Sequence, residues 1–125
     1  MSNTPSSARH EVARIDDIGD PGSREFVFAA GDRLVRAFVV RSGARIHAYL
    51  NCCPHAGQPL NRSPDGFLSA DNRLIMCRAH GATFAIESGV CVEGICLGES
   101  LQRLSAQIVD GVIVVNGEIA IEQQG

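Results

Sequence analysis

Several residue types and features common in other protein classes are scarce in this sequence. Its 125 residues include no tryptophan, one tyrosine and no lysine, since all eleven basic residues are arginines. No apolar run approaches the roughly 20 residues that a membrane-spanning helix needs. The formal net charge of −3 is opposite in sign to the basic excess that nucleic-acid-binding proteins use to contact phosphates. These absences argue against a membrane protein and against a nucleic-acid partner.

The composition that remains is typical of one folded domain. Hydrophobic residues make up 45% of the chain and charged residues 20%, and a chain of this length can bury a core. We expect a disordered polar lead-in over residues 1–8, then a single domain over 9–125, with His10 in the solvated tail. Because the N-terminus has no apolar signal segment, we expect a cytoplasmic protein, whose cysteines more often bind metal than form disulfides.

The chain is divided by turn residues into short runs rich in β-forming residues. The runs cover residues 25–29, 33–40, 44–50, 74–77, 84–87, 107–109, 112–115 and 118–121. Short strands at this spacing, with no amphipathic helix longer than two turns, predict an all-β antiparallel sandwich or barrel. The imperfect alternation within 33–40 predicts a strand that is covered on both faces.

Two stretches, 51–69 and 78–83, do not fit simple hairpins and contain paired metal-ligand residue types. The first contains Cys53-Pro54-His55 and the second Cys77-Arg78-Ala79-His80. Two thiolates and two imidazoles would close a tetrahedral zinc site, although zinc ribbons and fingers usually pair Cys with Cys and His with His. The pattern therefore predicts a four-ligand metal site and leaves the metal open.

These segments resemble the two ligand boxes of the Rieske iron–sulfur family. The first box is Cys-Pro-His-Ala-Gly-Gln-Pro-Leu over 53–60, and the second is Cys-Arg-Ala-His-Gly-Ala-Thr-Phe over 77–84. Residues 89–98 resemble the family's closing segment, with Ile95 where a proline often follows the glycine. The resemblance implies the Rieske fold, an antiparallel sandwich or barrel with a two-loop cluster-binding subdomain over about 51–98.

Carried over to these positions, the resemblance implies a [2Fe–2S] cluster. Cys53 and Cys77 would bind the inner iron, and His55 and His80 the outer one. Since two neutral imidazoles replace two thiolates, reduction potentials of such clusters lie at about −150 to +300 mV, above those of plant-type ferredoxins. The resemblance further implies that Pro54, Gly57, Leu60, Gly81 and Phe84 surround the cluster.

The residues beside the boxes predict the low-potential end of this range. High-potential members of the family carry a further cysteine in each box, which form a disulfide, and Ser and Tyr hydroxyls that donate to sulfur. The corresponding residues here are Gln58, Ala79, Ala82 and Phe84, which can form neither the disulfide nor those hydrogen bonds. Each lost hydrogen bond removes stabilisation from the electron-rich reduced state.

Small members of the family are similar to soluble Rieske ferredoxins, which carry one electron at a time from a flavin reductase to a terminal oxygenase. We therefore expect an electron-transport component rather than an enzyme. A mononuclear oxygenase iron needs two histidines and a carboxylate, and only His10 and His47 remain outside the boxes. Two alternatives remain: a Rieske-like small subunit of a nitrite-reductase type of enzyme, and a zinc-stabilised binding module. The oligomeric state and the final substrate are open.

The remaining cysteines and His47 are expected to have structural roles. Cys52 precedes the first box and is predicted to be a small buried apolar residue. Cys52-x-x-His55 is also a chelating spacing, but only Cys53 gives the Cys-x-His box. Cys91 and Cys96 are predicted to be two thiols, with a disulfide or a second metal pair as alternatives. His47 is expected to be a hydrogen-bonded or solvated histidine of a strand.

Overall fold

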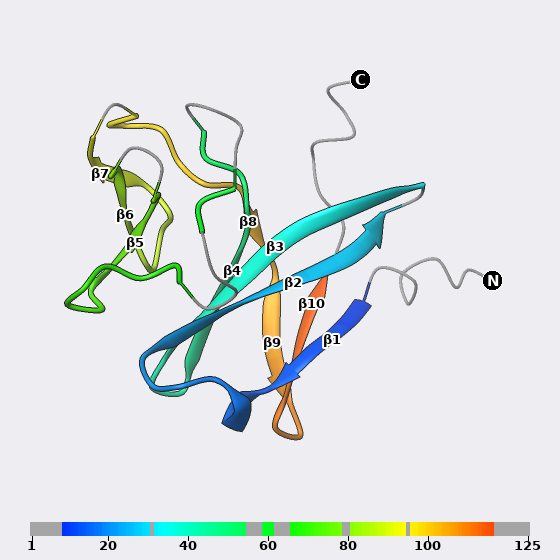
Figure 1. Ribbon diagram of the computed structural model, residues 1–125. Helices are drawn as coiled ribbons and strands as arrows, with labels where there is room; N and C mark the ends of the chain where they lie inside the picture. The colour runs from blue at the N-terminus through cyan, green and yellow to red at the C-terminus, as the bar shows by residue number, and fades with distance from the viewer. Residues whose placement is uncertain are drawn as a thin grey trace.

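A computed structural model describes residues 9–30, 32–54, 59–61, 66–78, 81–94 and 96–116 of the chain. One short 3-10 helix and ten strands occur in these ranges (Figure 1). They are β1 (Arg9–Arg14), η1 (Ile15–Asp17), β2 (Gly22–Ala30), β3 (Arg33–Ser42), β4 (Arg45–Leu50), β5 (Leu74–Met76), β6 (Thr83–Ala85), β7 (Cys91–Glu93), β8 (Arg103–Leu104), β9 (Ala106–Val109) and β10 (Val112–Asn116). No helix in the described ranges is long and apolar enough to cross a membrane.

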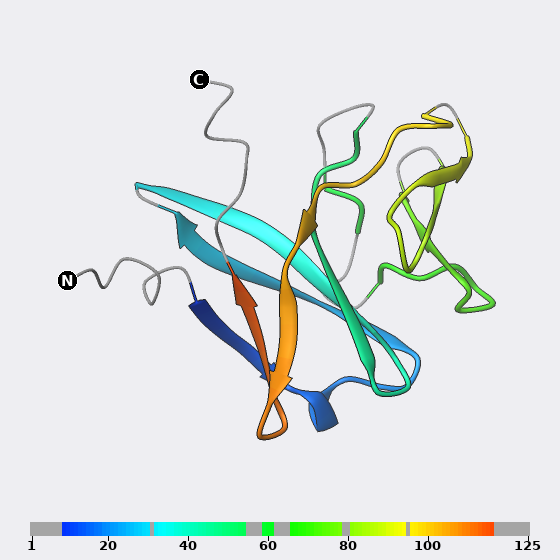
Figure 2. The ribbon, with the colours of Figure 1, turned by 180° about the vertical axis from the view of Figure 1, so that it is seen from behind.

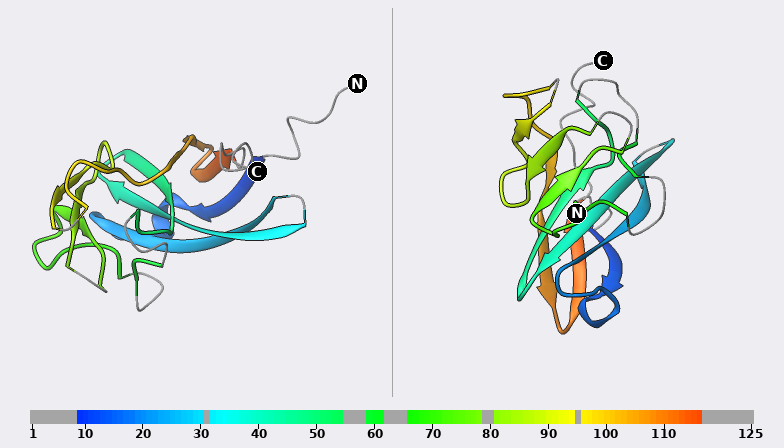
Figure 3. Two further views of the ribbon diagram at one scale, coloured as in Figure 1. Left: turned by 90° about the horizontal axis from the view of Figure 1, so that it is seen from above. Right: turned by 60° about the vertical axis from the view of Figure 1, so that its left-hand side comes forward.

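The strands form three antiparallel sheets. The central sheet has the order β2-β3-β4-β8, a second sheet has the order β1-β10-β9, and a third, smaller sheet has the order β5-β6-β7. Figures 1 and 2 show the β5–β7 sheet at one end of the long β2–β3 hairpin, away from β1 and β10. Seen from above in Figure 3, the β5–β7 sheet and the coloured loops beside it lie together at one end of the central sheet. We call the described residues between 51 and 101 the loop subdomain.

The middle of β3 is buried on both of its faces. Ala37 and Val39 belong to a core that the central sheet shares with β10, whereas Phe38 and Val40 belong to a core shared with the loop subdomain. The ring of Phe38 lies parallel to that of Phe67, with centroids 4.2 Å apart. Successive residues of a strand point to opposite faces, so four consecutive buried residues need a layer on each side. The expectation of a doubly covered strand is confirmed.

Most predicted strands are present, and none of their ends is shifted by more than three residues. The run at 118–121 and the lead-in at 1–8 lie outside the described residues. Three strands, β1, β7 and β8, are not predicted from the sequence. The predicted placement of His10 in a solvated tail is wrong, because β1 pairs with β10, and the His10 ring lies 5.0 Å from that of Phe28. The hydrogen-bonding partner of β1 lies about a hundred residues away in sequence, so no local pattern indicates the strand.

Candidate metal centre

The two cysteines of the predicted boxes meet in one buried cluster. Cys53 follows the end of β4, and Cys77 follows the end of β5. Their exposed fractions are 1% and 0%, and they share a hydrophobic cluster with Leu60, Ala82 and Phe84. All five cysteines of the chain are described, and none forms a disulfide. Two thiols from distant parts of the sequence are thus shielded from water in the same core.

Both ends of the first loop are held by the buried side chain of Asn51. Its amide nitrogen Nδ2 donates to Asn61 Oδ1 at 2.8 Å, and its Oδ1 accepts from the Leu60 backbone N–H at 2.7 Å. Its backbone N–H donates to the Arg36 carbonyl of β3 at 3.0 Å. Asn51 precedes Cys52-Cys53, and Leu60-Asn61 closes the first box, so one side chain fixes where the loop leaves and rejoins the core.

The carboxylate of Glu25 on β2 extends this network. Its Oε2 accepts from Arg36 Nε at 2.5 Å and from Asn51 Nδ2 at 3.0 Å, and its Oε1 accepts from Asn61 Nδ2 at 3.0 Å. Burial by itself raises the pKa of Glu25, but the hydrogen bonds from Arg36, Asn61 and Asn51 outweigh it, and the pKa is lowered from 4.5. Glu25 is therefore ionised at neutral pH and stabilises the first loop as an anion.

Two backbone hydrogen bonds join Cys77, at the start of the second loop, to Gly81 and Ala82. The Cys77 N–H donates to the Ala82 carbonyl, and the Gly81 N–H donates to the Cys77 carbonyl, both at 2.8 Å. Gly81 has a φ of +75°, a conformation that residues with a Cβ rarely adopt. The Arg78 N–H donates to the Leu60 carbonyl at 2.8 Å. The backbone of the second box is thus bonded directly to the end of the first.

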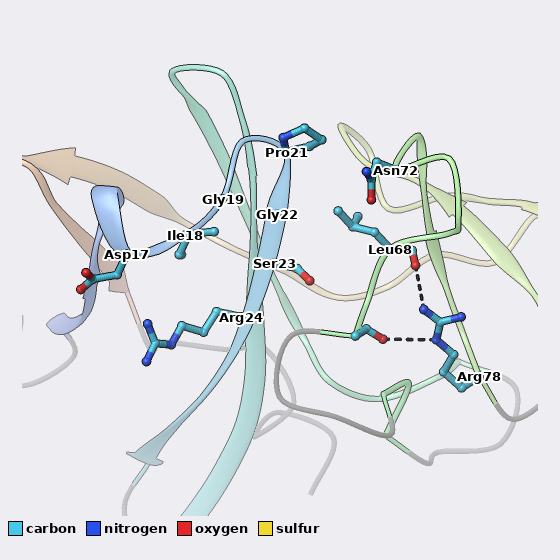
Figure 4. Close-up of a pocket in the computed structure, with 11 residues that line it drawn as sticks. Asp17, Ile18, Gly19, Pro21, Gly22, Ser23, Arg24, Leu68, Asn72 and Arg78 are labelled. Atoms are coloured by element: carbon cyan, nitrogen blue, oxygen red, sulfur yellow. Dashed lines mark hydrogen bonds between the residues drawn. The ribbon is translucent and has the colours of Figure 1, made fainter.

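The Arg78 side chain links the second box to the chain that follows the first loop. Its guanidinium donates to the carbonyls of Leu68 at 2.8 Å and Gly66 at 3.4 Å (Figure 4). These contacts lie at the edge of an open groove of about 660 Å³ between the start of β2 and the chain before β5. Neither buried cysteine of the boxes lines this groove, so it is separate from the candidate metal centre.

The closing segment packs directly on the second box. A Cβ added to Gly94, whose φ is +117°, would lie 2.8 Å from Ala82 Cα. The segment also buries Cys91 and Cys96, whose sulfur atoms are 3.2 Å apart. Burial and the contact with Cys91 raise the pKa of Cys96 to about 12, so Cys96 is a protonated thiol at neutral pH. The expectation of two thiols without a disulfide at these positions is confirmed.

Contacts outside the boxes, which the sequence analysis missed, join the loop subdomain to the central sheet. The Tyr49 hydroxyl donates to the Ile86 carbonyl, and Arg103 Nη1 donates to the Glu87 carbonyl, each at 2.6 Å. Arg103 Nη2 lies 3.1 Å from His47 Nδ1. Burial, followed by the charge of Arg103, lowers the pKa of His47, so the ring is neutral and accepts this hydrogen bond. The expectation of a hydrogen-bonded strand histidine is confirmed.

Three of the predicted site residues, His55, Gly57 and His80, lie outside the described residues. Of the others, Leu60 and Phe84 are fully buried beside the two box cysteines, Pro54 is half-buried and Gly81 is exposed. Among the described residues no group of three or more Cys, His, Asp or Glu side chains is arranged around a metal-sized space.

The predicted burial of Cys52 is wrong, because Cys52 is exposed whereas Cys53 is buried. Neighbouring residues of an extended segment point to opposite sides, so the burial of Cys53 turns Cys52 outward. Thr83 is not predicted as a site residue, but its hydroxyl Oγ1 is buried with no hydrogen-bond partner in the described part of the chain. In the sequence, a threonine between Ala82 and Phe84 is typical of an ordinary strand residue.

The residues present fit a cluster held partly by thiolates. Buried thiolates are ligands for soft metal centres and iron–sulfur clusters. Cys53 and Cys77 supply two thiols from two adjoining loops, and the surrounding Leu60, Ala82 and Phe84 would exclude water from the sulfur atoms. The hydrogen bonds at Asn51 and Cys77 hold both loops in place.

Comparisons with known proteins agree with this arrangement. The family model of the Rieske [2Fe-2S] domain matches residues 8–108. No protein of curated function matches the chain significantly. The ferredoxin of carbazole 1,9a-dioxygenase from Nocardioides aromaticivorans IC177 superposes with a TM-score of 0.69 and 21% identity, over 89% of this chain and 99% of that one.

Two complexes of carbazole 1,9a-dioxygenase contain chains of similar fold. In a complex of reduced oxygenase and oxidized ferredoxin, the match has a TM-score of 0.71 at 19% identity, over 90% of this chain and 96% of that one. In a reduced complex between oxygenase and ferredoxin, the TM-score is 0.72 at 16% identity, over 88% of this chain but only 28% of that one. At these identities the likeness concerns the fold, and it confirms the predicted all-β Rieske architecture. With its family model matched over most of its length, the chain belongs to the Rieske [2Fe-2S] domain family, whose cofactor is a [2Fe–2S] cluster.

Proposed function

We propose that this chain is a one-electron carrier of the Rieske ferredoxin type, which passes electrons from a flavin reductase to a terminal oxygenase. The observation that carries the proposal is the burial of Cys53 and Cys77 in one core within a Rieske fold. The likeness to the ferredoxin of carbazole 1,9a-dioxygenase supports the carrier role. We propose that residues 9–125 form its single domain and that it acts in the cytoplasm.

The proposed ligands are Cys53 and Cys77 for the inner iron and His55 and His80 for the outer iron. When bound, the cluster supplies a redox centre that accepts and returns a single electron. Cys53 and Cys77 would hold it from within the core, where Leu60 and Phe84 keep water from the sulfur atoms. The exposure of Cys52 supports Cys53 as the ligand of the first box.

The hydrogen bonds of the two loops would keep the ligands in place between oxidation states. Asn51 fixes both ends of the first loop, and the turn at Cys77 fixes the start of the second. Ala82 and Phe84 offer no hydroxyl to the buried thiols. The absence of these donors supports a reduction potential at the low end of the Rieske range.

We also propose that the chain carries no mononuclear catalytic iron. The two histidines outside the boxes have structural partners: His47 accepts from Arg103, and His10 lies against Phe28. They come from β4 and β1, in different sheets. The proposal therefore gives the chain the role of electron donor to an enzyme.

The test begins with anaerobically purified protein, reduced with dithionite and frozen for electron paramagnetic resonance. We expect a mixed-ligand Rieske signal of about one spin per chain, and bleaching of the visible absorption when NADH and a flavin reductase are added. Colourless protein with stoichiometric zinc and no signal would refute the carrier and indicate a structural metal module. Co-purification of an intact cluster with a large sirohaem subunit would instead indicate a nitrite-reductase role.

A further inference from the structure

The closing segment brings two cysteines into direct contact, and neither of them is a proposed cluster ligand. Cys96 Sγ donates to Cys91 Sγ at 3.2 Å, and Cys91 Sγ donates to the Glu93 carbonyl at 3.4 Å. The Cys91 carbonyl accepts from Gly98, and its N–H donates to the Glu99 carbonyl. These bonds pair Cys91 with Gly98 and Glu99, so the chain returns to Cys91. The two sulfur atoms therefore face each other across a turn of the chain.

This pair lies against the candidate metal centre. Cys91 and Cys96 belong to the same buried cluster as Cys53 and Cys77. The backbone between them, at Gly94, touches Ala82 of the second box so closely that no Cβ would fit. A change in the geometry of the turn therefore acts directly on the second box.

The turn over the pair is exposed even though the sulfur atoms are not. Cys91 and Cys96 have exposed fractions of 2% and 1%, but Gly94, Leu97 and Gly98 are exposed. The hydrogen bonds from Leu97 to Gly94 and from Gly98 to Cys91 are long, at 3.2 and 3.3 Å. Hydrogen peroxide is a small oxidant, so only a small opening of this exposed turn is needed for it to reach the sulfur atoms.

We propose that Cys91 and Cys96 are a redox-active dithiol that hydrogen peroxide converts to a disulfide beside the cluster. The Cys91 sulfur, which accepts the Cys96 S–H, attacks one oxygen of the peroxide. The O–O bond breaks, the departing hydroxide takes the Cys91 proton and leaves as water, and Cys91 becomes a sulfenic acid. The Cys96 sulfur then attacks the sulfenic sulfur, the S–S bond forms and a second water leaves. Two thiols and one peroxide thus yield one disulfide and two waters.

A pair with these contacts differs from two isolated buried cysteines. An isolated buried thiol has no second sulfur with which to resolve a sulfenic acid, so oxidation continues to irreversible products. Here the resolving thiol is already at 3.2 Å. A thiol reductant would restore the dithiol, which makes the change reversible.

The arginine pattern of the chain makes the test simple. Trypsin cleavage at Arg78 and Arg103 yields a peptide, residues 79–103, that holds Cys91 and Cys96 and no other cysteine. Cys77 falls in the peptide 74–78, and Cys52 and Cys53 fall in 46–62. A disulfide between Cys91 and Cys96 is therefore an internal link of one peptide, and the other peptides report on the box cysteines in the same digest.

Cluster-loaded protein is treated with stoichiometric hydrogen peroxide, alkylated in denaturant and digested. We expect peptide 79–103 to be lighter by two hydrogens and unalkylated, with the visible cluster absorption retained and the peptide restored to two alkylated thiols by a reductant. In Cys96→Ser, a dimedone probe should label Cys91 and no link should form, whereas Cys52→Ser, the matched surface variant, should form it normally. If Cys96→Ser fails to fold, the wild-type digest decides alone.

Two outcomes would overturn the proposal. One is a peptide 79–103 with both thiols alkylated after peroxide has oxidised the exposed Cys52. The other is a link that forms only as the visible cluster absorption disappears, because it would then arise from the unfolded loop subdomain. Both are read from the peptides and the cluster absorption, without an oxygenase, so they are independent of whether the chain donates electrons to one.

Discussion

Replacing Glu25 by glutamine tests whether the first loop depends on a charged anchor on β2. The side chain of Glu25 is 15% exposed and that of Arg36 is 48% exposed. Because Arg36 can turn to water, its ion pair contributes at most about 1 kcal/mol. The bonds from Asn51 and Asn61 are donated to a charged acceptor in a less exposed place, where each contributes about 1.5 kcal/mol or more.

The single amide oxygen of glutamine can accept only some of the hydrogen bonds that the carboxylate accepts from Arg36, Asn51 and Asn61. The glutamine NH₂ group is itself a donor, so it cannot accept from the others. Asn51 keeps its bonds to Asn61 and Leu60. We therefore expect Glu25→Gln to lower the free energy of unfolding by about 2 kcal/mol, which corresponds to roughly 8 °C in Tm for a chain of this size. Thermal unfolding of the cluster-loaded protein, followed by visible absorption and by far-UV circular dichroism, measures this.

The dependence on pH gives a second readout. The folded pKa of Glu25 is lowered from 4.5, so its contribution is fully present above pH 4.5 and is lost as the pH falls through the folded pKa. The stability difference between wild type and Glu25→Gln should thus shrink below pH 4.5. Glu11→Gln, at an exposed position of β1, is the matched control. A Tm unchanged from that of the control at neutral pH would refute the anchoring role.

Three further substitutions test the site. Cys53→Ser should abolish the visible cluster spectrum, whereas Cys52→Ser, at the exposed neighbour, should leave it unchanged; the reverse result would shift the ligand register by one residue. Gly94→Ala adds a steric clash to an unfavourable φ, so it should lower Tm by several degrees more than Gly98→Ala, where φ is +90° but nothing lies within 4 Å; equal losses would show that the closing segment does not press on the second box. Thr83→Val removes a buried hydroxyl without a partner in the described structure and should raise the unfolding free energy by about 1 kcal/mol. A fall in stability or in reduction potential would instead show that this hydroxyl donates a hydrogen bond to the cluster.

Local chemistry explains which features could be predicted from the sequence. A run of β-forming residues between turn residues indicates a strand when the run has five or more residues, as in β2, β3 and β4. β7 and β8, with three and two residues, are too short for any alternation to show; β5 and β6 are as short as β7 and were predicted only because longer β-forming runs contain them or overlap them. β1 also escaped detection, because its stability depends on pairing with β10 at the other end of the chain.

The same division applies to the site. Two Cys/His boxes specify the ligand chemistry by residue type and spacing, so the sequence by itself determined the family and the candidate ligands. Packing between β2, β3 and the loops decided that Cys53 rather than Cys52 is buried. The same packing places Glu25 where it anchors the first loop. The 3.2 Å contact of Cys91 with Cys96 also belongs to the tertiary structure. Spacing in a sequence limits which residues can meet, but the direction of each side chain depends on the layers that fold around it.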